Sequence, residues 1–278
     1  MKRKTYRSRD VSLDLLMLVA KYFGDARHVH YGYWEDGVEL NLANLPKAQE
    51  AYCDFILSHI PDGTKTVLDV GCGVGGLSRR LLDAGYTVDA LSPSSVLNAY
   101  ARELLGDEAP IHECRFEDID TTRKYDMIVF SESFQYVNPT KAFENCAALL
   151  APGGHVLICD IFRVKTADKS PMGGGTRLHR FNAALEGAPF EKIKDIDITR
   201  QTGRTMEMVN DFLMRVAKPG HDMLLDFVRE RNPWITRIMT WWFRKKLATI
   251  DRKYFQGRRG LEMFMKYKSY RLIVFKRV

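Results

Sequence analysis

Short apolar runs alternate with amphipathic stretches over the middle of the chain. The apolar runs are rich in β-branched side chains, which is typical of buried strands. The stretches between them repeat apolar residues three and four positions apart, which is typical of helices. The alternation predicts an α/β protein with a parallel, doubly wound sheet. The predicted strands are residues 66–70, 86–91, 111–115, 125–130 and 154–161, and the predicted helices between them are residues 75–84, 94–105 and 140–149.

Different patterns flank this core. Two helices are predicted ahead of it, and the regular alternation ends after Phe162. A glycine-rich loop, a half-exposed strand, a mostly helical region and a last strand follow, at residues 171–175, 192–199, 205–255 and 270–277. The two N-terminal helices are predicted at residues 10–24 and 44–60.

The patterns divide the chain into four parts. Residues 1–60 form a helical and aromatic lid segment, and residues 61–162 form the core. Residues 163–268 form a helical insertion that contributes the strand 192–199 to the sheet. Residues 269–278 form the closing strand.

A glycine-rich turn directly follows the first predicted strand. Gly71, Gly73 and Gly76 match the G-x-G-x-x-G pattern of dinucleotide-binding turns, where glycine lets a ligand approach the main chain. Asp69 precedes the first glycine by two residues, where its charge would repel a pyrophosphate and attract an ammonium group. The turn also lacks the Lys-Ser/Thr pair of a P-loop. We therefore expect a nucleotide-like cofactor that carries an amino acid.

The segment V-L-D-V-G-C-G-V-G-G (67–76) resembles motif I of the class I S-adenosylmethionine (SAM) methyltransferases. Y-D-M-I-V-F (125–130) is similar to that family's fourth strand, and L-A-P-G-G-H-V-L-I (150–158) is similar to its turn into the fifth. The resemblance covers residues 60–165 and is greatest to tocopherol-type and cyclopropane-fatty-acid-synthase-like members. It implies a Rossmann-like, seven-stranded, doubly wound sheet with N-terminal helices and a helical insertion before an antiparallel last strand. It also implies SAM at the carboxyl ends of the strands and S-adenosylhomocysteine as the product.

The resemblance implies which residues bind SAM. Ser92 stands where most members have a carboxylate for the ribose, which weakens that contact because a neutral hydroxyl replaces a charged acceptor. Phe116 and Glu117 lie in a turn that resembles the adenine-binding segment, although loop packing would explain them equally well. The predicted cofactor-binding residues are Asp69, Gly71, Gly73, Gly75, Ser92, Phe116, Glu117 and Ser131.

Two clusters are candidates for the methyl-transfer step. The segment H-Y-G-Y-W (30–34) is similar to one that closes over SAM in related members, so Tyr31 and Tyr33 are expected to face the sulfonium. The alternative is an aromatic plug that pins the N-terminal helix to the core. At the end of the fourth strand, Glu132 is the candidate general base and Gln135 the candidate hydrogen-bond donor to the acceptor. Glu132 would otherwise only order the ammonium group of the cofactor.

Charge is divided unevenly along the chain. Residues 1–160 contain 16 Lys and Arg against 23 Asp and Glu, a net charge of −7, whereas residues 161–278 contain 26 against 12, a net charge of +14. Basic and aromatic residues gather within residues 241–268. This composition fits an anionic membrane surface, an acidic carrier protein or a lid over a lipid-like substrate with an anionic group. The ordinary alternative is that the rings pack inward and the charges are solvated.

The remaining features limit the function. Five scattered cysteines without C-x-x-C predict reduced thiols in the cytoplasm, and no His, Cys and Asp spacing predicts a metal site. The D/N-P-P-Y motif of nucleic-acid methyltransferases does not follow the fourth strand, which argues against nucleic-acid substrates. We therefore expect a SAM-dependent methyltransferase (EC 2.1.1) that methylates a carbon, nitrogen or oxygen atom of a small or lipid-like acceptor. The alternatives are a nucleic-acid methyltransferase, which the basic half favours, and a SAM-binding regulatory module without turnover.

Overall fold

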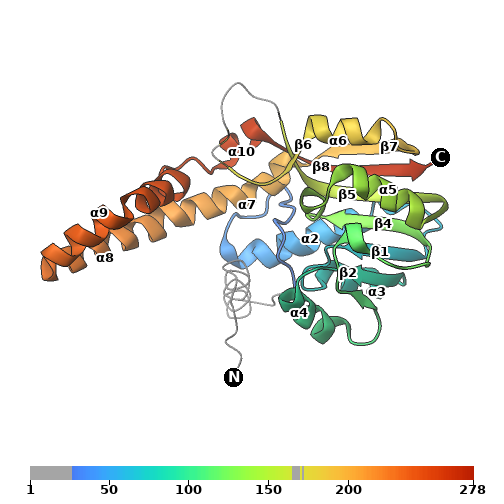
Figure 1. Ribbon diagram of the computed structural model, residues 1–278, viewed down its shortest axis with the longest axis horizontal. Helices are drawn as coiled ribbons and strands as arrows, with labels where there is room; N and C mark the ends of the chain where they lie inside the picture. Colours follow the sequence, from blue (N-terminus) through green and yellow to red (C-terminus); the bar gives the residue numbers. More distant parts are fainter. Residues whose placement is uncertain (1–26, 165–169, 171) are drawn as a thin grey trace.

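The computed structural model describes residues 27–164, 170 and 172–278, which are built around one twisted sheet (Figure 1). The strands follow the order β3-β2-β1-β4-β5-β8-β7, and β6 pairs with β5 off this path. Strands β1 to β5 are parallel, whereas β8 is antiparallel to both β5 and β7. The predicted sheet, with its antiparallel last strand, is confirmed. The strands are β1 Thr66–Val70, β2 Thr87–Leu91, β3 Ile111–His112, β4 Tyr125–Ser131, β5 Leu150–Arg163, β6 Thr176–Arg177, β7 Phe190–Asp197 and β8 Lys268–Arg277.

Helices cover both faces of the sheet. Successive side chains of a strand point to opposite faces, so Val67 packs in one apolar cluster and Leu68 in the other. The first cluster contains side chains of α2, α3, α4, α7 and α10, and the second contains side chains of α5 and α6. This two-sided burial is what makes the fold doubly wound. The helices are α2 Leu45–Leu57, α3 Gly76–Asp83, α4 Ser95–Leu105, α5 Pro139–Leu149, α6 Leu178–Leu185, α7 Thr199–Phe212, α8 Lys218–Arg231, α9 Pro233–Ile250 and α10 Leu261–Tyr267.

Local chemistry sets the helix boundaries next to the carboxyl ends of the strands. The Ser94 side chain accepts a hydrogen bond from the Leu97 N–H at the start of α4. The Asn138 side chain accepts two backbone N–H bonds at the start of α5, where Pro139 occupies the first turn. Each helix therefore begins close to the edge at which the strands end.

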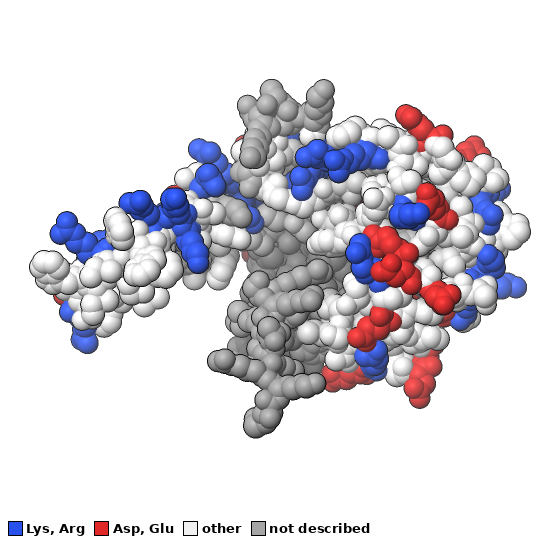
Figure 2. All heavy atoms as spheres, viewed as in Figure 1, with Lys and Arg blue, Asp and Glu red and all other residues white. Residues whose placement is uncertain are grey.

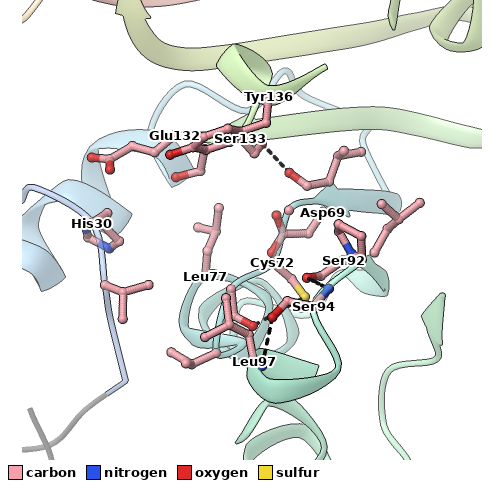
Figure 3. Close-up of a pocket in the computed structure, with 18 of the residues that line it drawn as sticks. His30, Asp69, Cys72, Leu77, Ser92, Ser94, Leu97, Glu132, Ser133 and Tyr136 are labelled. Carbon is pink, nitrogen blue, oxygen red and sulfur yellow. Dashed lines mark hydrogen bonds between the residues drawn. The ribbon is translucent and has the colours of Figure 1, made fainter. Parts of the chain in front are cut away.

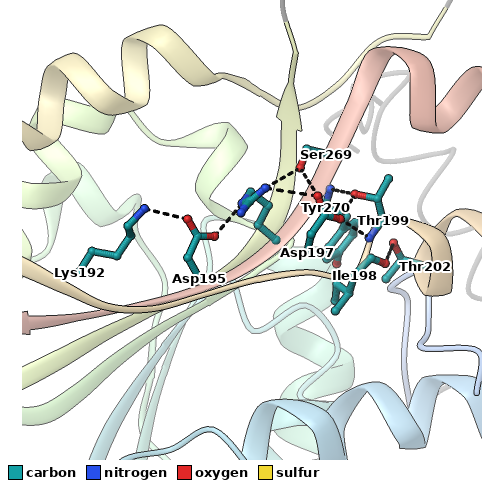
Figure 4. Close-up of polar contacts among 9 residues, drawn as sticks. Lys192, Asp195, Asp197, Ile198, Thr199, Thr202, Ser269 and Tyr270 are labelled. Atoms are coloured by element: carbon teal, nitrogen blue, oxygen red, sulfur yellow. Dashed lines mark hydrogen bonds and ion pairs between the residues drawn. The ribbon is translucent and has the colours of Figure 1, made fainter.

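Polar contacts fix β8 against β7 and the start of α7 (Figure 4). The Tyr270 N–H donates to Thr199 Oγ1 at 2.8 Å, and the Thr199 N–H donates to Asp197 Oδ1 at 2.9 Å. Ser269 Oγ donates to Asp197 Oδ2 at 3.1 Å. These bonds fix the position of Tyr270 on β8, between β5 and β7.

Some predicted elements differ from the observed ones. Strand β3 stops at His112 instead of residue 115, because its only partner on the sheet path, β2, ends at Leu91. The sequence did not predict β6, α6 or α10, which are too short, at two, eight and seven residues, for their apolar residues to establish a period. The predicted helix at residues 10–24 lies outside the described residues, and the other core elements match their predictions to within a few residues.

Helices α8 and α9 form a long antiparallel hairpin, residues 218–250, that projects away from the sheet (Figure 1). Trp234, Trp241 and Trp242 on this hairpin are 78%, 65% and 75% exposed. The prediction that the rings pack inward is therefore wrong for the single chain. They cannot pack inward because α9 has one neighbouring helix along most of its length and does not reach the core.

Candidate active site

A cavity of about 360 Å³ opens at the carboxyl ends of β1, β2 and β4 (Figure 3). Asp69, Ser92 and the glycine turn lie on one side, and Glu132 and His30 lie on the other. In an open α/β sheet this edge is where ligands bind. The predicted residues that line the cavity are Asp69, Gly71, Gly73, Ser92, Phe116, Glu117, Ser131 and Glu132.

The glycine turn is shaped by contacts that exclude side chains. Gly71 has a φ of +81°, and a Cβ atom there would lie 2.3 Å from Ser133 Cβ. A Cβ atom on Gly76 would lie 2.0 Å from the Arg27 carbonyl oxygen, so Gly76 also requires glycine and lines the cavity. Gly75 does not line the cavity, although we predicted that it binds the cofactor. It precedes α3 with a φ of +90° and packs against α4.

Asp69 places a buried carboxylate at the base of the cavity. The residue is 1% exposed, and Ser78 Oγ donates a hydrogen bond to its Oδ2 at 2.6 Å. Burial raises the pKa of Asp69 to about 6, against the opposing effect of the Ser78 bond. A cationic group bound nearby would lower this pKa, so the site is suited to an ammonium ligand.

Ser92 follows β2 and lines the cavity, as predicted for the ribose position. Asp89, the nearest carboxylate in the sequence, is turned away from the cavity. It accepts hydrogen bonds from Arg123 Nη1 at 2.6 Å and Tyr125 Oη at 2.7 Å, and His112 Nε2 lies 3.3 Å away. The protein therefore uses this acid to join β2, β3 and β4, and the cavity keeps only the hydroxyl.

Phe116 and Glu117 lie in a short 3-10 helix, Phe116–Asp118, at the cavity wall. Phe116 is buried and packs edge-to-face on Phe130 at 5.2 Å between ring centroids. Glu117 accepts the Asn138 N–H at 3.1 Å and pairs with Arg115 at 3.1 Å. Both residues thus pack against neighbouring segments as well as lining the cavity. Their contact with a cofactor stays a prediction.

Glu132 combines a strained backbone with an enclosed carboxylate. Its φ of +53° makes it the one residue other than glycine with a positive φ in the described part of the chain. Its Oε1 accepts hydrogen bonds from the Tyr31 N–H at 2.8 Å and Tyr270 Oη at 2.7 Å. Burial raises the pKa of Glu132 to about 8, and the charge of Asp160 adds to the effect. Among the described residues no donor contacts Oε2, which leaves that oxygen available to a ligand.

A chain of hydroxyl groups extends from Glu132 into the core. Tyr270 Oη lies 2.8 Å from Tyr52 Oη, and Ser131 Oγ donates to Tyr52 Oη at 3.3 Å. Burial raises the pKa values of both tyrosines, so they remain neutral donors. Sequence reasoning missed Tyr52 and Tyr270 because α2 and β8 are far from Glu132 along the chain. Only the register of β8 on β5, Ile161 opposite Tyr270, brings them together.

Three predicted catalytic residues do not line the cavity. The Tyr31 ring lies 5.9 Å from that of Phe264, and the Tyr33 ring stacks on Phe55 at 4.8 Å. Gln135 donates through its N–H and Nε2 to Asp160 at 3.0 and 3.1 Å, and its Oε1 accepts the Gly175 N–H at 2.8 Å. Tyr31 still acts on the site through its backbone N–H, whereas Tyr33 and Gln135 hold neighbouring segments in place. Their catalytic roles stay predictions that this geometry does not favour.

His28, His30 and Cys53 form a cluster beside the cavity that their spacing does not reveal. Cys53 Sγ lies 3.8 Å from His28 Nδ1 and 3.7 Å from His30 Nε2. His28 Nε2 lies 3.0 Å from Glu50 Oε1, which orients its ring. Burial raises the pKa of the Cys53 thiol, so without a bound cation the thiol is neutral. We interpret the cluster as polar packing, and the expectation of no metal site stays a prediction.

Comparison with known proteins identifies relatives of the domain. The family model described as a methyltransferase domain matches residues 44–184, just over half of the chain. A ubiquinone biosynthesis O-methyltransferase of Vibrio vulnificus (strain YJ016) is 34% identical over 119 residues, which cover 40% of this chain and 50% of that protein. The chain thus spans about half the length of the curated relatives that it matches first.

Solved structures share the fold over almost the whole chain. Geranyl diphosphate C-methyltransferase from Streptomyces coelicolor A3(2), in complex with S-adenosyl-L-homocysteine, has a TM-score of 0.63 at 15% identity, covering 99% of this chain and 94% of that chain. The 4+2 cyclase SpnF has a TM-score of 0.68 at 18% identity, covering 96% and 93%. The sequence match and the shared fold lead to one conclusion: this chain belongs to the methyltransferase domain family.

Proposed function

We propose that the protein is a SAM-dependent methyltransferase that acts on a small or lipid-like acceptor. One observation carries the proposal: a buried carboxylate, Asp69, faces a cavity whose opposite wall holds a second one, Glu132. The family match and the complex of geranyl diphosphate C-methyltransferase with S-adenosyl-L-homocysteine support the choice of cofactor. When bound, SAM supplies an activated methyl group on a sulfonium.

The residues of the cavity suit the parts of SAM. Asp69 would attract the ammonium group of the methionine moiety, and the backbone of Gly71 and Gly76 lines the cavity beside it. We assign Ser92 to the ribose and Phe116 to the adenine ring, because both residues line the cavity. A pyrophosphate at the turn would be repelled by the acid beside it, Asp69.

Glu132 is the residue that we assign to the acceptor. Its raised pKa, about 8, makes the ionised carboxylate a base strong enough to take a proton from an acceptor hydroxyl or ammonium group. Tyr270 and the Tyr31 N–H hold Oε1, so that Oε2 can point to the acceptor. A carbon acceptor would lose a proton to the same oxygen. The named relatives include both an O-methyltransferase and a C-methyltransferase, in keeping with this range of acceptor atoms.

Calorimetric titration with S-adenosylhomocysteine tests the cofactor. We expect micromolar binding at pH 7.5 that weakens below pH 6, where Asp69 takes up a proton. Asp69→Asn should weaken it about tenfold or more, while Asp107→Asn, the same change at an exposed site, should leave it unaltered. Tight binding of NAD or ATP without binding of S-adenosylhomocysteine would refute the proposal.

A non-methylating function is the second candidate. It is favoured by one observation: SpnF, a 4+2 cyclase, has the same fold, so that the fold alone does not establish methyl transfer. Release of S-adenosylhomocysteine from SAM with a mixture of small phenols, amines and prenyl diphosphates decides between the two. Turnover that rises with pH up to about 8 and is lost in Glu132→Gln supports methyl transfer with Glu132 as base. Cofactor binding without turnover on any acceptor would favour the non-methylating function, a module that binds SAM without transferring its methyl group.

We also place the enzyme in the cytoplasm. All five cysteines are free, which suits a reducing compartment. Across the helices described here, none is both long and apolar enough to cross a lipid bilayer. A chromosomal fusion to a fluorescent protein tests the location, and fluorescence outside the cytoplasm would contradict it.

A further inference from the structure

We propose that the α8–α9 hairpin docks the protein on an anionic membrane surface. The inference concerns where the protein works, and it does not require methyl transfer. Large apolar side chains cover the hairpin: besides the three tryptophans, more than 40% of the surface of each of Met223, Leu224, Phe227, Ile235, Ile238 and Met239 is exposed. An apolar surface of this extent on a single chain marks an interaction site.

The apolar surface of α9 faces away from its partner helix. Thr236 is 4% exposed, and its Oγ1 donates to the Val228 carbonyl of α8 at 3.3 Å, so this side of α9 is the one that packs. At 100° per residue, Trp234, Ile238 and Trp241 lie about 150° around the helix from Thr236. Helix α8 therefore cannot cover them, and their burial requires something outside the described chain.

The charge of residues 231–250 indicates the kind of partner that would cover the apolar surface. Residues 231–250 contain five Lys and Arg and no Asp or Glu. Figure 2 shows Lys and Arg along the hairpin, while most of the visible Asp and Glu lie on the body. Arg244 lies over the Trp241 ring at 5.5 Å and Lys246 over the Phe243 ring at 5.6 Å. Apolar rings flanked by cations are the composition of helices that lie in the interface of an anionic bilayer.

A membrane fits better than a second copy of the chain. Two copies that paired through α9 would bring Arg237, Arg244, Lys245 and Lys246 of one against the same four cations of the other, with no acid on α9 to offset them. An anionic bilayer offers the opposite charge together with an apolar layer for the tryptophans. The observations therefore favour lipid.

Docking through the hairpin would also orient the cavity. Strand β7 is parallel to β5, since both are antiparallel to β8, so α7 leaves the sheet at the carboxyl-end edge. This is the edge at which the cavity opens. The hairpin projects from the same side (Figure 1), so a bound bilayer would lie on the side of the cavity that an apolar acceptor has to enter.

Co-sedimentation of the full chain with vesicles tests the proposal. We expect at least about tenfold more binding to phosphatidylcholine vesicles with about 30 mol% phosphatidylglycerol than to phosphatidylcholine alone, with a blue shift of tryptophan fluorescence. Replacing two of the three exposed tryptophans, Trp241→Ser with Trp242→Ser, should reduce the binding about tenfold. Absence of binding to anionic vesicles, or equal binding to neutral ones, would overturn the proposal.

A pair of charge-reversal variants separates the effect of the charge on the hairpin from the effect of the protein's net charge. The hairpin variant is Arg244→Glu, Lys245→Glu and Lys246→Glu, and the control makes the same change in net charge on the body, at the exposed residues Lys124, Lys141 and Lys192. Only the hairpin variant should lose binding, and equal losses would overturn the proposal. Unchanged S-adenosylhomocysteine binding and melting temperature verify that each variant is folded. A dimer that the hairpin variant abolishes, or salt-sensitive RNA binding at the hairpin in place of lipid binding, would replace the membrane as the partner.

Discussion

Glu132 should make the protein less stable as the pH rises through neutrality, and Glu132→Gln should remove that loss. Below pH 4.5 the carboxyl group is protonated in both the folded and the unfolded chain. Between pH 4.5 and about 8 the unfolded chain releases this proton while the folded chain keeps it. The folded chain then binds more protons, so the free energy of unfolding falls as the pH increases.

The size of the effect follows from the pKa. The difference between the ordinary value of 4.5 and about 8 corresponds to about 5 kcal/mol at most, because each pH unit is worth about 1.36 kcal/mol. One side of Glu132 faces the open cavity, and water there solvates part of the charge. We therefore expect about 3 kcal/mol, which for a chain of this size is a difference in melting temperature of about 6–12 °C.

Glutamine suits this comparison because it retains the contacts of the carboxyl group. Its amide oxygen can accept from the Tyr31 N–H and from Tyr270 Oη, as Oε1 of the native residue does. Asp160 is also buried, with its pKa raised to about 7, and is present in both proteins. The difference between the two proteins therefore reports Glu132 together with its interaction with Asp160.

Urea unfolding of both proteins at intervals from pH 5 to pH 9 measures the difference. The variant should match the native protein near pH 5 and exceed its stability progressively up to pH 8 to 9. Glu186→Gln, a substitution of the same kind at an exposed residue directly after α6, should give a curve parallel to that of the native protein. If the Glu132→Gln curve were parallel as well, Glu132 would be ionised in the folded protein at neutral pH, and the argument for a raised pKa would fail.

Two further sets of substitutions test the packing of the turn and of the core. Gly71→Ala should cost more than about 3 kcal/mol and abolish cofactor binding, because its Cβ would lie 2.3 Å from Ser133 Cβ. Gly85→Ala has the same kind of backbone strain at φ +90° with open space around it, so it should cost only about 1–2 kcal/mol, and equal melting temperatures would contradict the clash. Trp34 Nε1 donates to Thr205 Oγ1 at 2.8 Å in the core, so Trp34→Phe and Thr205→Val should each cost about 1–3 kcal/mol in urea unfolding. Their double mutant should be less destabilised than the sum by about 1 kcal/mol, and strict additivity would show that the bond contributes nothing.

The sequence predicted the sheet and the floor of the cavity for a physical reason. Buried parallel strands need apolar side chains on both faces, which leaves a pattern that can be read without a structure. A backbone bend that a ligand approaches closely needs glycine, which marks the turn at Gly71 and Gly73. Asp69 was recognisable because an acid inside an apolar strand is costly unless it has a partner or a role.

The other wall of the cavity could not be predicted in the same way. Tyr33 was chosen because its segment is similar to one that closes over SAM, and Gln135 because it follows the fourth strand. Phe55 and Asp160 nevertheless fix where their side chains lie. Tyr270 was overlooked because its hydroxyl reaches Glu132 only through the pairing of β8 with β5. Side-chain direction in such regions depends on partners that are distant along the chain, and no local pattern records them.

The sequence also could not predict whether the apolar side chains of the hairpin are buried. A helix with apolar residues over more than half of its circumference can lie in a core or on a membrane, and its composition does not distinguish the two locations. What separates the two is the number of neighbours, and α9 has α8 on the side of Thr236 and water around Trp234 and Trp241. The ordinary expectation that these rings pack into the protein's own core is therefore wrong, while a membrane or protein partner for them stays a prediction. The exposed rings and the cations lie on one helix, so the partner surface has to bind both of them. A bilayer with anionic headgroups does so, because its charges and its apolar layer meet at the interface in which such a helix lies.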